Sequence, residues 1–185
     1  LHSFWTRPKQ DADGGEQDIT LKDFEALTWL VSALQARRHG TIRMLTDTRG
    51  QRFLRRTGME WVYDGGVSTA LDDTPRDIHP QVFWTAGRMF AFGLMDGPFT
   101  SVDTDAILWQ PLQPAAPVMA LHYEDRRWAS YVSNRADFGR FGLTGRAWNW
   151  RLQPVNLGIV SFPSPAVTRS FSNEALRFMS KYSQW

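Results

Sequence analysis

Residues 99–112 read FTSVDTDAILWQPL, a stretch that joins a predicted strand to two closely spaced carboxylates. Phe99 to Val102 has the aromatic and β-branched character of a strand, and Asp103 and Asp105 follow its end directly. In an open α/β sheet, ligands bind just outside the carboxyl ends of the strands. Two carboxylates suit Mg²⁺ or Mn²⁺, which complete their coordination with water and phosphate oxygens. Asp is also common in ordinary turns, so the triplet alone leaves both interpretations open.

Around this stretch, strand and helix patterns alternate along the chain. The expected strands cover residues 1–6, 41–46, 61–63, 99–102, 118–123 and 155–162, and the expected helices cover residues 18–38, 51–57, 81–95 and 167–182. Such alternation is typical of βαβ units, so we expect an α/β fold with a mostly parallel sheet and helices on both faces. The length suits one domain, 1–185, with an irregular Arg- and Trp-rich insertion at 126–153.

The helix expected at residues 18–38 has the clearest pattern. Its apolar residues recur at three- and four-residue spacing and form one stripe, which we expect to face the core: Leu21, Phe24, Leu27, Leu30, Val31 and Leu34. Thr20 and Asp23 resemble a capping box at its start.

Polar residues follow three of the expected strands. They are Thr6-Arg7, Asp47-Thr48-Arg49 and Asp103-Thr104-Asp105. Right-handed crossovers place the loops after parallel strands at one edge of the sheet, so we expect these loops to lie close together.

Composition excludes several classes of protein. The chain has no cysteine, which excludes disulfides, thiolate metal sites and a cysteine nucleophile. The lack of cysteine also suits a cytoplasmic protein, which we expect here. No apolar run reaches the length of a membrane span, and the start shows no signal-peptide pattern. The net charge of +2 does not by itself indicate nucleic-acid binding.

The order of several motifs resembles that of the nucleotide-sugar-dependent glycosyltransferases of the GT-A fold. The resemblance is carried by an aromatic first strand, a second-strand end, the helix before the acidic triplet, the triplet itself and a later strand, at residues 3–5, 44–50, 84–92, 99–112 and 155–160. It implies transfer of a sugar from a nucleoside diphosphate sugar to the hydroxyl group of an unknown acceptor.

The resemblance also implies roles for individual residues. Asp103 and Asp105 would hold Mn²⁺ or Mg²⁺, with Asp105 as the direct ligand and Asp103 at the ribose or a bound water. The residues implied in nucleotide-sugar binding are Ser3, Trp5, Asp47, Arg88, Asp103 and Asn156. Arg88 suits a diphosphate by its charge and its bidentate geometry, although a solvated helix arginine has the same sequence signature.

The chain departs from this pattern in its C-terminal part. No histidine follows His122, so a further metal ligand of that type is missing, and the catalytic base stays unassigned. Downstream, Asp137 is the candidate for the base, and Glu174 lies in a helix pattern that favours solvation. The alternatives are an inactive GT-A-like scaffold or partner subunit and a nucleic-acid-binding module that uses the interleaved Arg and aromatic residues of 126–153. The same residues also fit a sugar-diphosphate pocket or a solvated face, and nucleic acid is not favoured.

Overall fold

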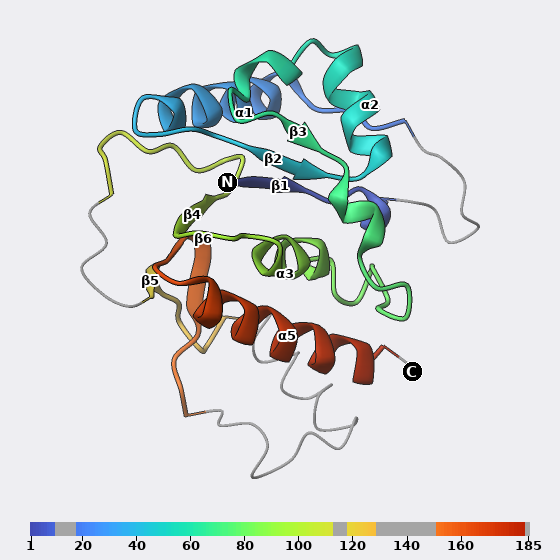
Figure 1. Ribbon diagram of the computed structural model, residues 1–185, viewed down its shortest axis with the longest axis vertical. Helices are drawn as coiled ribbons and strands as arrows, with labels where there is room; N and C mark the ends of the chain where they lie inside the picture. Colours follow the sequence, from blue (N-terminus) through green and yellow to red (C-terminus); the bar gives the residue numbers. More distant parts are fainter. Residues whose placement is uncertain (10–17, 113–117, 129–150, 184–185) are drawn as a thin grey trace.

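A computed structural model describes residues 1–9, 18–112, 118–128 and 151–183 (Figure 1). Three short strands near the N-terminal half of the chain form a parallel sheet in the order β1-β2-β3: β1 (His2–Phe4), β2 (Met44–Thr46) and β3 (Val67–Ser68). Ser3 pairs with Leu45, and Leu45 pairs with Ser68. The carboxyl ends of β1 and β2 therefore lie at the same edge, as the sequence predicts.

Helices cover both faces of this sheet. In Figure 1, α1 (Asp23–Arg37) and α2 (Thr48–Arg56) lie above the strands, whereas α3 (Ala86–Gly93) and α5 (Pro165–Lys181) lie below them. Successive side chains of a strand point to opposite faces. Accordingly, Met44 packs in a cluster with side chains of α1 and α2, and Leu45 packs in a second cluster with side chains of α3. The expected α/β fold with helices on both faces is confirmed.

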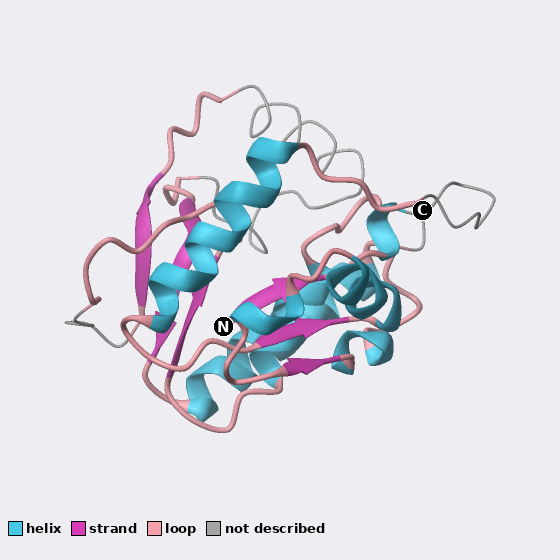
Figure 2. Cartoon of the chain, turned by 90° about the horizontal axis from the view of Figure 1, so that it is seen from above, coloured by secondary structure: helices cyan, strands magenta, loops and turns pink. Residues whose placement is uncertain are grey.

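The second group of strands, separate in Figure 2, is antiparallel and corrects the expectation of a mostly parallel sheet. In it, β6 (Val155–Phe162) lies between β4 (Phe99–Val102) and β5 (Met119–Tyr123) and runs against both. Parallel neighbours need a crossover that usually contains a helix, whereas antiparallel neighbours do not. β4 and β5 each pair with β6, so both pairs of this sheet are antiparallel.

Leu1 links the two sheets. Its nitrogen donates to the carbonyl oxygen of Thr100 at 2.7 Å, and the nitrogen of Val102 donates to the Leu1 carbonyl oxygen at 2.9 Å. Leu1 therefore bonds to two residues of β4 that are two positions apart, Thr100 and Val102. This is the hydrogen-bond pattern of two parallel strands. The end of β4 therefore lies beside the start of β1 and runs in the same direction, so the chain leaves β4 toward the edge where β1 and β2 end.

The prediction of a strand at residues 61–63 is wrong. These residues belong largely to the 3₁₀ helix η2 (Glu60–Val62), and the third strand is β3. Val62 and Tyr63 have the apolar character of a strand, but they are buried in the cluster beneath α1 and α2. Gly66, with φ of +83°, then turns the chain into β3. Two further 3₁₀ helices are η1 (Arg7–Lys9) and η3 (Ala70–Asp73).

The expected burial of the α1 stripe is also only partly correct. The buried residues of α1 are Trp29, Ser32, Ala33 and Ala36, whereas Phe24, Leu27 and Leu34 are exposed. Small side chains allow close approach to the core, so the helix turns this side inward and leaves larger apolar groups outside. The expected capping pair is replaced by Glu25, which accepts from the Lys22 nitrogen at 2.9 Å.

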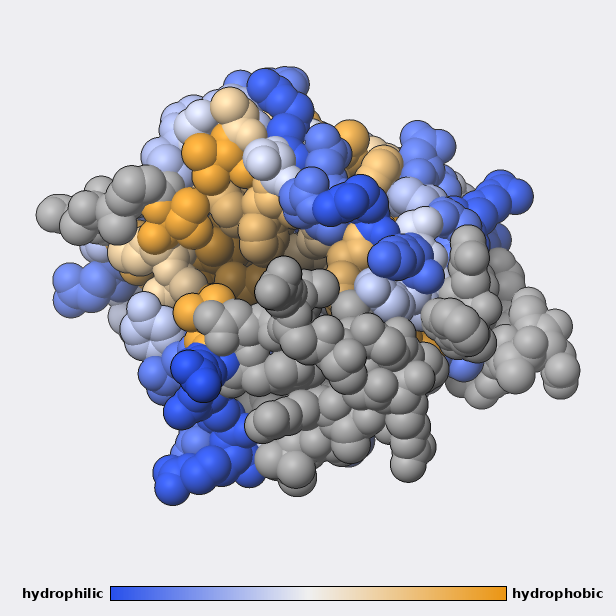
Figure 3. Space-filling view, turned by 90° about the horizontal axis from the view of Figure 1, so that it is seen from below, coloured by the Kyte–Doolittle hydropathy of each residue, from blue (hydrophilic) through white to orange (hydrophobic). Residues whose placement is uncertain are grey.

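Apolar side chains are exposed elsewhere too. Figure 3 shows a group of them around a hollow on one face of the molecule. None of the helices within the described ranges has both the length and the apolar character needed to cross a membrane.

Candidate functional site

A cleft of about 970 Å³ opens where the ends of β1 and β4 meet α1 and the start of α3. One wall is apolar and comes mainly from the outer side of α1. The other end is polar and includes two acidic residues and one arginine. The lining residues are Ser3, Phe4, Trp5, Leu21, Phe24, Glu25, Leu27, Thr28, Trp29, Val31, Trp84, Thr85, Arg88, Asp103, Thr104, Asp105 and Ile107. Ligand sites in proteins combine apolar walls with a few polar groups in this way.

At the polar end, Asp103 begins the loop that follows β4. Its nitrogen donates to the Gly158 carbonyl oxygen at 2.6 Å, which fixes the start of the loop against β6. Its carboxylate forms an ion pair with Arg88, and the two side chains are 28 % and 19 % exposed. Asp105 lies two residues further on and is exposed. Burial raises the pKa of the Asp103 carboxyl, Arg88 opposes this shift, and the charge of Asp105 adds to it.

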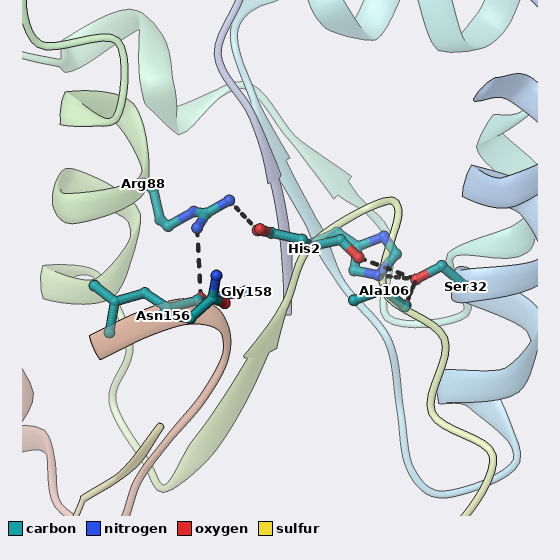
Figure 4. Close-up of polar contacts among 8 residues, drawn as sticks. His2, Ser32, Arg88, Ala106, Asn156 and Gly158 are labelled. Carbon is teal, nitrogen blue, oxygen red and sulfur yellow. Dashed lines mark hydrogen bonds and ion pairs between the residues drawn. The ribbon is translucent and has the colours of Figure 1, made fainter. Parts of the chain in front are cut away.

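Arg88 connects three elements at this end of the cleft (Figure 4). It projects from α3, pairs with Asp103 after β4, and donates from Nη1 to the Leu157 carbonyl oxygen of β6 at 3.4 Å. It is therefore partly buried in a network, which distinguishes it from a solvated helix arginine.

A buried polar network supports the acidic loop from the side of α1. Ser32 Oγ lies 3.1 Å from the Asp103 carbonyl oxygen and 2.5 Å from that of Ala106. The same hydroxyl lies 3.3 Å from His2 Nε2 (Figure 4). On the other side of the ring, His2 Nδ1 lies 3.1 Å from the Tyr63 hydroxyl. His2 is fully buried, and this burial lowers its pKa to about 3. The ring is therefore neutral at physiological pH.

The structure brings most of the sequence-predicted residues together. Ser3, Trp5, Arg88, Asp103 and Asp105 all line the cleft, although they come from three separate parts of the chain.

Asp47 and Asn156 are not among the lining residues, and their side chains bond within the protein. Asp47 caps α2 by accepting from the Gly50 nitrogen at 2.8 Å. Asn156 accepts from the Gly158 nitrogen at 2.8 Å and donates to Glu124 Oε1 at 2.6 Å. Asp137 lies outside the described residues.

Sequence reasoning missed several residues of the site. Phe24 and Leu27 belonged to a stripe assigned to the core, and no periodic pattern distinguishes a core stripe from a ligand-facing one. Trp84 lines the cleft from the segment before α3 and is 64 % exposed.

The Arg- and Trp-rich segment 126–153 is described only at its two ends. Arg127 pairs with Asp125 at 2.6 Å, and Arg126 donates to the Arg151 carbonyl oxygen at 3.0 Å. These exposed arginines therefore have partners within the protein.

Two carboxylates at the polar end of the cleft, those of Asp103 and Asp105, could contribute oxygen ligands to a cation. Within the part of the chain that the structure describes, no group of three or more His, Cys, Asp or Glu residues is arranged to hold a metal. If a cation binds beside Asp103 and Asp105, water or ligand oxygens would supply its remaining ligands. Mg²⁺ accepts one or two carboxylates together with substrate phosphates in this manner.

Comparisons with known proteins give one match. No curated protein and no solved structure matches the chain. The profile of one family, described as a family of unknown function (DUF6734), matches residues 1–132. These residues include β1, the cleft walls, Arg88 and the acidic loop. The chain belongs to the DUF6734 family.

Proposed function

We propose that this protein is a metal-dependent glycosyltransferase that binds a nucleoside diphosphate sugar in the cleft and passes the sugar to an acceptor hydroxyl. The observation that carries the proposal is the convergence of Arg88, Asp103 and Asp105 at one end of a large cleft beside the end of β1. The resemblance of the sequence to GT-A enzymes supplies the reaction type, since a fold alone does not establish a function.

The arrangement of strands supports this proposal. Leu1 aligns the end of β4 with the start of β1 in the same direction, so the acidic loop continues toward the edge where β1 ends, and the loop and Trp5 both line the cleft. Ligands of α/β proteins bind at such an edge. A GT-A-like arrangement of the whole sheet is part of the proposal.

The charged and the apolar residues of the cleft would have different roles in binding the ligand. Asp103 and Asp105 would hold the Mn²⁺ or Mg²⁺ ion, which supplies Lewis-acid stabilisation of the leaving diphosphate. Arg88 would bind a phosphate oxygen by exchanging part of its contact with Asp103, because a guanidinium offers several donors. The apolar wall with Phe24 and Leu27 would hold the less polar part of the ligand and exclude water from it.

The proposal is tested by calorimetric titration of UDP and GDP, each with and without Mn²⁺. We expect one of these nucleotides to bind in a metal-dependent way and Asp105→Asn to weaken this binding at least tenfold. Asp105 is exposed, so the substitution leaves the fold intact. Asp96→Asn is the matched control, because Asp96 is also exposed but lies in the turn before β4, outside the cleft lining.

Two results would contradict the proposal. One is the absence of binding for both nucleotides with metal present. The other is an equal effect of Asp105→Asn and Asp96→Asn, which would assign the acidic loop to an ordinary turn and favour the scaffold alternative.

A further inference from the structure

A chain of buried polar side chains ends at the main chain of the acidic loop. Its members, in order, are Trp29, Tyr63, His2 and Ser32, and none of them is more than 4 % exposed. The Trp29 indole nitrogen donates to the Tyr63 hydroxyl, which lies 3.1 Å from His2 Nδ1. On the other side of the ring, His2 Nε2 lies 3.3 Å from Ser32 Oγ (Figure 4). Groups buried this deeply depend on one another for their hydrogen bonds.

The two ends of this chain determine the direction of each hydrogen bond in it. The Trp29 indole N–H group only donates, and the carbonyl oxygens of the loop only accept. Burial lowers the pKa of His2 to about 3, so the ring is neutral and carries one proton. The Tyr63 hydroxyl accepts from Trp29 and can donate to His2 Nδ1, which leaves the ring proton on Nε2. The opposite direction would leave the buried Tyr63 proton without an acceptor among the described residues.

With the ring proton on Nε2, Ser32 accepts from His2 and directs its own proton at the acidic loop. Ser32 Oγ lies 2.5 Å from the Ala106 carbonyl oxygen and 3.1 Å from that of Asp103. These two residues are the ends of a turn, which the Ala106 nitrogen closes by donating to the Asp103 carbonyl oxygen at 3.0 Å. Asp105 lies within the turn. The hydroxyl therefore contacts both ends of the segment that carries the two carboxylates, and groups in such places orient metal ligands.

We propose that Ser32 is a positioning residue, which holds the acidic loop in the conformation that presents Asp103 and Asp105 to a cation in the cleft. The buried chain behind Ser32 supports this role by keeping His2 protonated on Nε2. The role toward the cation rests on the proposed function, whereas the hold on the loop does not.

The direction of the chain is tested by the tautomer of His2. We expect ¹H–¹⁵N spectra of protein labelled in its four histidines to show, at neutral pH, a His2 ring protonated on Nε2. His2→Gln identifies the His2 signals by their disappearance. A ring protonated on Nδ1 would take up the Ser32 proton and release the loop, so this result would overturn the proposal.

The positioning role is tested with Ser32→Ala. We expect faster hydrogen exchange at the Ala106 amide, because its turn loses the contact with the hydroxyl. We also expect the Mn²⁺-dependent binding of UDP or GDP to weaken about tenfold, as is typical when a group that orients metal ligands is lost. Ser172→Ala is the matched control, since the equally buried Ser172 hydroxyl donates to the Met89 carbonyl oxygen at 2.7 Å and lies outside the cleft lining. A general loss of stability would affect both variants, whereas we expect weaker binding in Ser32→Ala alone.

The possible outcomes separate this inference from the proposed function. If the wild type binds a nucleotide with metal and Ser32→Ala binds it as tightly as Ser172→Ala does, the positioning role is overturned and the proposed function stands. If the wild type binds neither nucleotide, the proposed function fails. The hydrogen exchange of Ala106 then decides whether Ser32 holds the loop, and an unchanged rate in Ser32→Ala would overturn that as well.

Discussion

Replacing Asp47 with alanine tests whether this residue serves the fold or the ligand. The sequence placed it in the nucleotide site, but the structure gives both of its carboxylate oxygens partners within the protein. Oδ1 accepts from the Gly50 nitrogen at 2.8 Å, and Oδ2 accepts from the Thr6 nitrogen at 2.7 Å. The Thr6 hydroxyl lies 2.9 Å from each oxygen. Asp47 thus joins the end of β1 to the start of α2.

The expected loss of stability follows from these bonds. Removing a helix N-cap typically costs about 1 kcal/mol. Thr6 is 1 % exposed, so its N–H group would be left buried without a partner, at a cost of about 1–3 kcal/mol. We therefore expect Asp47→Ala to lower the free energy of unfolding by about 2–4 kcal/mol. With an m-value of about 2 kcal/mol/M, the midpoint of urea unfolding falls by about 1–2 M.

Asp72 provides a matched control. It accepts from the nitrogen of Thr48 at 2.9 Å and from its hydroxyl at 2.6 Å, also at the start of α2, but it is exposed. Water replaces these bonds in Asp72→Ala, so we expect a loss of less than about 1 kcal/mol. Equal midpoint shifts in the two variants would refute the reasoning. So would a folded Asp47→Ala protein that retains its urea midpoint but loses nucleotide binding.

Two further predictions concern buried contacts near the cleft. The folded-state pKa of His2, about 3, lies below the unfolded value of about 6.5. Its contribution to stability is therefore present above pH 6.5 and declines as the pH falls toward 3, by at most about 1.4 kcal/mol per pH unit. Urea midpoints measured across this range should depend less steeply on pH in His2→Gln, and equal slopes would contradict the prediction. Gly87→Ala should lower stability by about 1–3 kcal/mol, because its Cβ overlaps Trp5, whereas Gly97→Ala faces open space and should leave the melting temperature nearly unchanged. Equal melting temperatures in these two variants would contradict the prediction, because they would show that α3 moves away from Trp5 with no loss of stability.

The parts of the fold that depend on local patterns were predictable. The strands at 99–102 and 155–162 have the predicted boundaries, and the closing helix begins two residues earlier than predicted. These segments have strong apolar or β-branched patterns between clear breaks. β3, by contrast, has only two residues, and its pairing with β2 defines it rather than its own sequence.

Strand direction and helix orientation were not predictable, because they depend on distant contacts. The antiparallel placement of β6 follows from its pairing with β4, more than fifty residues away in sequence. The inner side of α1 is chosen by small residues such as Ala33 and Ala36, although its larger apolar residues form the more obvious stripe. The role of Asp47 had a readable signal, since an Asp immediately before a helix is a typical N-cap. The helix was expected to begin at residue 51 instead of Thr48, which hid this signal.

The way the acidic loop is held bears on how a ligand would bind. Its backbone is fixed from behind, where Ser32 contacts the carbonyl oxygens of Asp103 and Ala106 and connects them to the neutral ring of His2. Its charged side faces the cleft, where Arg88 already holds the Asp103 carboxylate. A ligand therefore meets a loop whose main chain is ordered before binding, which reduces the entropy lost on association. The remaining cost would be electrostatic, because Arg88 and Asp103 would exchange part of their mutual contact for contacts with the ligand. An anionic ligand that arrives together with a cation satisfies both groups at once, whereas either ion alone leaves one of them with an unfavourable neighbour.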